Sequence, residues 1–77
     1  MFTLNLTLRG RPLAPAKYEN FEEMGDGLVK ALEDAGLGIH PSAMALLISR
    51  MFGDLLGRLT WRWVADDYEI YVAHCDP

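Results

Sequence analysis

The sequence predicts an α+β fold, a two-layer sandwich in which two helices cover one face of a three-stranded antiparallel sheet, in the order β-α-α-β-β. Three observations lead to this prediction. Residues 2–9 alternate apolar and polar side chains, residues 20–35 and 41–57 carry apolar residues at helical spacing, and residues 58–73 alternate again. Two layers are the simplest way for such elements to bury their apolar faces. We expect one domain over residues 1–77, because a chain of this length supports a single modest core.

The N-terminal segment has the clearest strand pattern in the chain. Its apolar residues alternate with polar ones: Phe2, Leu4, Leu6 and Leu8 with Thr3, Asn5, Thr7 and Arg9. A period of two places one set on a buried face of a sheet and the other set on the opposite face. Gly10, Pro12 and Pro15 follow, and they predict a loop between this strand and the first helix.

The first helix is predicted to begin at Asn20, because Asn20 followed by Glu23 has the form of a capping box. One apolar stripe then recurs at helical spacing: Phe21, Met24, Leu28, Ala31, Leu32 and Ala35. We expect Gly25 and Gly27 to weaken this helix by about 1 kcal/mol each relative to alanine. Gly36 is a natural residue to end it.

The second helix is predicted to begin at Pro41, which suits a first helical turn, and to end at Gly57. Its apolar residues cover about half of its circumference: Met44, Leu47, Ile48, Met51, Phe52, Leu55 and Leu56. A face of this width can pack on both a sheet and a neighbouring helix. Leu46 falls on the polar side and is the apolar residue left over.

The C-terminal segment is predicted to form a β-hairpin with a turn at Asp66–Asp67. The position of the first strand relative to this hairpin stays open between two arrangements. The predicted buried layer of the sheet is Phe2, Leu4, Leu6, Leu8, Leu59, Trp61, Trp63, Tyr68, Ile70 and Val72. The opposite face meets water or a partner and would show Thr3, Asn5, Thr7, Arg9, Arg58, Thr60, Arg62, Glu69 and Tyr71.

Cysteine usage and hydropathy predict a cytoplasmic protein. Cys75 is the only cysteine, so no intrachain disulfide can form, which fits a reducing compartment, and we expect an inert thiol. Residues 1–8 lack the basic and apolar regions of a signal peptide. The longest stretch without a charged residue, 35–49, is too short and too interrupted by glycine and proline to span a bilayer.

The motifs of catalysis and metal binding are missing, so we expect a protein that is not an enzyme and uses no cofactor or metal. His40 and His74 are the only histidines, and neither has a nucleophile or acid at relay spacing. Glu22 and Asp26 form an i,i+4 carboxylate pair, for which a solvated helix face is the favoured explanation over a weak metal site. A DNA-reading helix-turn-helix is strongly disfavoured, because the second helix has no basic residue before Arg50.

Charge is the most informative feature of the chain. Residues 19–34 hold six acids against Lys30 alone, a sum of −5, while the rest of the chain sums to +1. Such asymmetry governs encounter and partner choice rather than fold, and it predicts a basic partner. A row of carboxylates can take the place of backbone phosphates in a basic groove that normally holds nucleic acid. The candidate partner-binding residues are Glu22, Glu23, Asp26, Glu33 and Asp34, and the alternative is a helix face that is acidic only because it is solvated.

In its small size, acidic charge, cysteine usage and lack of catalytic motifs, the chain resembles the small inhibitor proteins of phages and mobile elements. Anti-CRISPR and anti-restriction proteins are the best-known members of this group. The resemblance is one of type and covers the whole chain. It implies a protein that binds a basic, nucleic-acid-handling surface of a host defence complex through its acidic helix and blocks that surface sterically. Neither direct nucleic-acid binding nor membrane binding is expected.

Two alternatives of other classes remain open. The first is a homodimeric regulatory or antitoxin-like module, in which small residues at four-residue spacing and an exposed leucine form the interface: Leu46, Ser49, Gly53 and Gly57. The second is an RNA-binding protein that uses the open sheet face, with Arg9, Arg58, Arg62 and Tyr71. The net charge of −4 disfavours the second alternative, because phosphate binding needs a basic surface.

Overall fold

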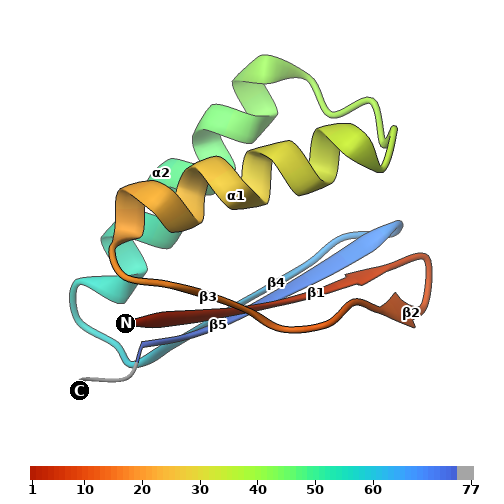
Figure 1. Cartoon of the computed structure of the whole chain (residues 1–77). Coiled ribbons are helices and arrows are strands. Elements are labelled where there is room, and N and C mark those ends of the chain that lie inside the picture. Colours follow the sequence, from red (N-terminus) through yellow and green to blue (C-terminus); the bar gives the residue numbers. More distant parts are fainter. Residues whose placement is uncertain (75–77) are drawn as a thin grey trace.

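The computed structural model describes residues 1–74 and has two layers, with both helices on one face of a five-stranded antiparallel sheet (Figure 1). Cys75, which the sequence predicts to be an inert thiol, lies outside the described residues. The elements in chain order are β1 (Phe2–Leu8), β2 (Arg11–Pro12), β3 (Ala16–Tyr18), α1 (Phe21–Asp34), α2 (Pro41–Leu55), β4 (Thr60–Val64) and β5 (Tyr68–His74). The predicted α+β class and the placement of both helices on one face are confirmed.

The centre of the sheet is the pairing of β1 with β5. These strands run antiparallel over their full lengths, from Phe2 opposite His74 to Leu8 opposite Tyr68. β4 pairs with the other edge of β5 through the predicted hairpin, where the Ala65 N–H donates to the Tyr68 carbonyl at 2.8 Å. The first strand therefore lies beside the last one, which decides the strand order that the sequence left open.

The predicted number of strands is wrong, because β2 and β3 lie where the sequence indicates a loop. Both pair with the free edge of β1, so that Arg11 is opposite Leu8 and Tyr18 is opposite Phe2. With two and three residues, these strands are too short to show alternation. Pro12, which donates no N–H, is acceptable on such an edge strand.

A tight turn joins β1 to β2. Arg9 and Gly10 form its two central residues and both have positive φ, 50° and 80°. A two-residue hairpin loop of type I′ requires positive φ at both positions, because this turn matches the twist of the paired strands. The signal is present in the sequence as Arg-Gly, but it is weaker than the usual Asn-Gly, since arginine rarely adopts this conformation.

Helix α1 begins as predicted. The Asn20 side chain accepts a hydrogen bond from the Glu23 N–H at 2.8 Å, which satisfies one of the free N–H groups of the first turn. The predicted apolar stripe faces the sheet, and Met24, Leu28 and Leu32 are fully buried. The chain leaves the helix through Gly36, whose positive φ of 68° suits a glycine.

Helix α2 begins with a cap that the sequence did not reveal. His40 is the N-cap residue, and its Nδ1 accepts a hydrogen bond from the Ser42 N–H at 3.1 Å. Near the other end of the helix, the Asp54 carboxylate accepts a hydrogen bond from the indole Nε1 of Trp61 at 2.9 Å. This bond ties the C-terminal turn of α2 to β4 and gives the buried indole N–H its partner.

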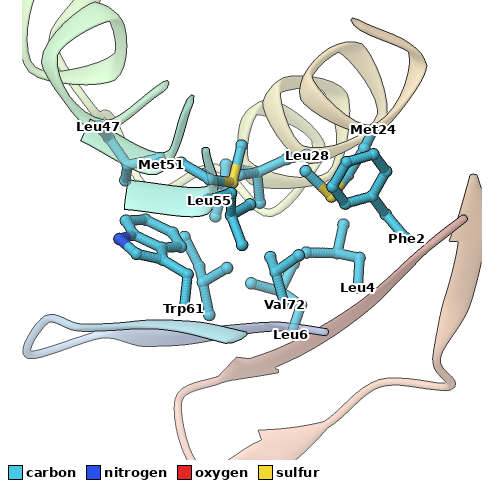
Figure 2. Packing of buried hydrophobic residues seen from close by; sticks show 12 residues of the cluster. Phe2, Leu4, Leu6, Met24, Leu28, Leu47, Met51, Leu55, Trp61 and Val72 are labelled. Atoms are coloured by element: carbon cyan, nitrogen blue, oxygen red, sulfur yellow. The ribbon is translucent and has the colours of Figure 1, made fainter. Parts of the chain in front are cut away.

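The core lies between the sheet and the two helices. In Figure 2, side chains of α1 and α2 meet those of β1, β4 and β5. The buried residues are Phe2, Leu4, Leu6, Met24, Leu28, Leu32, Leu47, Met51, Leu55, Trp61, Ile70 and Val72. Three further residues of the predicted buried layer, Leu8, Trp63 and Tyr68, are partly buried against this core.

The prediction that Leu59 is buried is wrong, since this side chain is 68% exposed. Leu59 has the alternation expected of an inward-facing strand residue, but it precedes β4. It lies in the connection that follows α2, where the helix has already ended at Leu55. The alternation in the sequence therefore continues one residue beyond the start of β4 at Thr60.

The packing around Gly27 explains why a glycine stands at this position of α1. A Cβ placed at Gly27 would overlap the Tyr18 side chain, lying 2.6 Å from Cζ and 2.9 Å from Cε1, whereas a Cβ at Gly25 would meet nothing within 4 Å. The Tyr18 ring, on β3, thus packs directly against the backbone of α1. This contact offsets the conformational cost of a glycine in the helix.

We predict opposite effects for alanine at the two glycines of α1. Gly25→Ala should raise the free energy of unfolding by about 0.5–1 kcal/mol through helix propensity. Gly27→Ala should lower it by about 1–3 kcal/mol, the usual effect of overpacking. Urea unfolding measures both changes. In a Tyr18→Ala background Gly27→Ala should become stabilising, and a loss of stability that persists there would contradict the proposed contact.

We predict that Asp54→Ala lowers the free energy of unfolding by about 1–2 kcal/mol, because the buried indole N–H of Trp61 loses its acceptor. Asp54→Asn is the matched control. It keeps an acceptor oxygen and removes a negative charge from a helix C-terminus, so it should unfold at nearly the wild-type urea concentration. Equal loss in both variants would mean that the hydrogen bond contributes little.

Candidate functional site

The five candidate acids of α1 all lie on its solvent side. Each of them is exposed, opposite the stripe that packs on the sheet. Three of them, Glu22, Asp26 and Glu33, form a single row, because at 100° per residue they fall within about 40° of one another. The first two are about 6 Å apart along the axis, and the third lies about 10 Å further on.

The other two candidate acids form a second row. Glu23 and Asp34 lie beyond Lys30 on the helix surface, so that the lysine separates the two rows. Within residues 1–74, none of the five carboxylates makes an ion pair with another side chain. The negative charge of the helix is therefore not neutralised inside the described fold.

An apolar groove of about 620 Å³ runs between α1 and α2, and sequence analysis did not predict it. Phe21 and Val29 line it from α1, and Met44, Ala45, Ile48 and Phe52 line it from α2. Glu33 is the one ionisable residue among the described residues that line it. Glu33 therefore places one end of the row formed by Glu22, Asp26 and Glu33 at the α1 lip of this groove. Glu22 and Asp26 continue the row along α1 and do not line the groove.

A chain of aromatic rings forms one end of the groove. Phe21 and Phe52 meet edge to face with centroids 4.9 Å apart, which brings α1 and α2 together. Phe21 also contacts Phe2 at 6.2 Å, and Phe2 stacks on His74 at 4.3 Å. These contacts link both helices to the two central strands, so the side chains that form this end of the groove are held in place by the fold.

The groove extends past its central part at both ends. A smaller hollow shares Glu33, Ile39 and Met44 with it, and another shares Phe21 and Phe52. The apolar surface therefore runs along the whole helix pair. The signal in the sequence was the width of the apolar face of α2, which exceeds what a sheet alone buries.

Three of the four candidate self-association residues lie on the exposed side of α2, and one of them, Ser49, also lines the groove. Leu46 is 55% exposed, and Ser49 and Gly53 are exposed on neighbouring turns of the helix. Gly57 is exposed as well, but it follows the end of the helix at Leu55, so it does not extend the row. The structure thus brings three of the four residues together.

The open sheet face does not gather the arginines that an RNA-binding surface would need. Arg9 and Arg58 lie outside the strands, near opposite ends of β5. The Arg9 N–H donates to the Asp67 carbonyl at 2.8 Å, just before β5 begins. The carbonyl of Leu59, the residue after Arg58, accepts from the N–H of His74 at the other end. The length of β5 separates these ends by about 20 Å.

The third arginine of that face has partners within the chain. Arg62 pairs with Glu69 at 3.5 Å, and its guanidinium lies 5.7 Å from the centre of the Tyr71 ring. Both contacts are cross-strand pairs of an ordinary solvent-facing sheet. The aromatic ring that could stack on a base is thus covered by an arginine of the neighbouring strand.

Comparison with protein-family models, with curated proteins and with solved structures found no match to this chain. Over residues 1–74, no helix has both the length and the apolar character needed to cross a bilayer. In the same range, no three side chains of histidine, cysteine, aspartate or glutamate are grouped so that they could hold a metal ion.

Proposed function

We propose that this protein is a non-enzymatic inhibitor of the phage or mobile-element type, which binds a basic, nucleic-acid-handling surface of a host defence complex through α1. Glu22, Glu23, Asp26, Glu33 and Asp34 would occupy positions that the partner otherwise offers to phosphates. One observation carries the proposal: these carboxylates are all exposed on one helix and have no ion-pair partner within residues 1–74. The partner would be blocked sterically, without any chemical step.

The physical basis of this proposal is the electrostatic steering of association. A net charge of −4 on α1, and of −5 over residues 19–34, attracts a basic surface over a range set by ionic strength. The Debye length is about 10 Å in 0.1 M salt and about 3 Å in 1 M salt. The association rate should therefore fall steeply as salt is added, while the fold, whose core contains no buried charge among the described residues, should not change.

We predict that Glu22→Lys/Asp26→Lys/Glu33→Lys abolishes inhibition and leaves the fold intact. The measurement is the plating efficiency of phage on bacteria that carry a defined CRISPR or restriction system and express the protein. A panel of such systems is needed, with wild type restoring plating against its target. Circular dichroism reports on the fold, which should persist because all three side chains are exposed.

A matched pair of variants controls for net charge. Glu22→Lys/Asp26→Lys and Asp66→Lys/Asp67→Lys change the charge by the same amount, but the second pair is exposed on the β4–β5 turn. We expect inhibition to be lost in the first variant and kept in the second. Equal loss in both would mean that only the total charge matters, and full activity of the triple variant would contradict the proposal.

Self-association through α2 is the second candidate function, and the 55% exposure of Leu46 beside Ser49 and Gly53 favours it. If the protein is a homodimeric regulatory module, light scattering should give twice the mass of 8.7 kDa. Leu46→Glu would then convert it to the monomer, because a charge placed in the apolar contact has no partner. A wild type that is already monomeric at high concentration excludes this candidate.

A further inference from the structure

We propose that the groove between α1 and α2 binds an amphipathic, basic α-helix of the partner protein. The apolar side of that helix would fill the groove, and its lysine and arginine side chains would meet Glu22, Asp26 and Glu33 along the lip. This inference rests on the proposed function, because it names the element of the basic partner that the acidic helix would contact.

The groove has apolar surface that the fold itself does not bury. The sheet covers Leu47 and Met51 on one side of α2, whereas Phe52 on the adjoining side remains 49% exposed. Ala45 is exposed as well, and both residues line the groove. An apolar groove bordered by a charged side chain is a kind of surface at which another protein can bind.

The groove favours a helix over an extended segment. Its walls are side chains of two helices, and they offer few polar groups to pair with the N–H and C=O groups of a strand. A helix satisfies its own backbone and presents an apolar stripe to such a groove. The 14 residues of α1 span about 21 Å, so four turns of a partner helix can lie alongside it.

The charge on the lip favours a basic helix. Glu33 lines the groove, and Glu22 and Asp26 lie in the same row. A partner helix that runs alongside α1 has the same rise per residue, so basic residues at i, i+4 and i+11 would face the three carboxylates. A second copy of this chain that docked groove to groove would bring a second acidic row here, and an anionic lipid surface would also be repelled.

The test uses two synthetic peptides of 18 residues with equal positive charge. One consists of leucine and lysine at helical spacing, and in the other every leucine is replaced by glutamine. Fluorescence anisotropy of the labelled peptides measures their affinity for the full chain in low salt. We expect the leucine peptide to bind at least about tenfold more tightly, because only this peptide can fill the groove.

Two alanines of α2 provide a matched pair of protein variants. Ala43 and Ala45 are both exposed, but only Ala45 lines the groove. Ala45→Gln should weaken binding of the leucine peptide about tenfold, and Ala43→Gln should leave it within about twofold. Phe52→Ser is the second groove variant and should also weaken binding, since it removes the aromatic end wall. Circular dichroism confirms that each variant is folded.

The outcomes separate this inference from the function on which it rests. The two peptides could bind equally, with an affinity that falls in salt and does not change in Ala45→Gln. The acidic face would then bind basic partners without the groove, and the inference would be overturned. If neither peptide binds, both proposals fail. If the protein alone is a dimer that Ala45→Gln dissociates, or if it binds vesicles through the groove, the occupant is a second copy or a membrane and the inference is again overturned.

Discussion

The antiparallel ladder between β1 and β5 is the interaction on which the rest of the structure depends. It joins the two ends of the described chain, and each remaining strand pairs with one of its two members. The buried side chains of these two strands form the floor on which both helices pack. Because the two strands are far apart in sequence, the chain must close a long loop before most of the core can form, which costs entropy and slows folding.

The helices complete a core that contains few residues. Much of their outer surface does not pack against the rest of the fold. All the acids of α1 lie outside the packed stripe, and the groove begins where the contact between α1 and α2 ends. A small domain has little apolar surface to spare, so leaving Phe52 half-exposed forgoes part of its stabilisation. The fold thus presents an apolar and an acidic surface side by side on the helical layer, and the opposite face of the sheet carries ordinary cross-strand pairs.

The parts of the fold that depend on local sequence could be predicted. The alternation in β1, the Asn20 cap and the buried stripe of α1 each follow from residues a few positions apart, and all three are found in the structure. By contrast, β2 and β3 exist because the free edge of β1 is available to them. Two or three residues carry no periodic signal, so the sequence indicates a loop there.

The candidate site shows the same division. Periodicity places the acids on the solvent side of α1, and the structure agrees for each of them. Periodicity cannot show how closely α2 approaches α1, so it predicts that the apolar residues of the groove pack against a neighbouring helix. From the sequence, Gly27 likewise predicts only a weakened helix, because its contact with Tyr18 comes from a strand that the sequence does not reveal.

The position of the two strand ends also determines how the molecule responds to force. Phe2 is opposite His74, so the ends of β1 and β5 leave the sheet at the same corner. Tension applied between them would load the ladder one residue pair at a time, and the strands would peel apart instead of shearing as a unit. The first pair to separate carries the ring stack that continues through Phe21 to Phe52, so pulling would disturb the end of the groove before either helix unfolds.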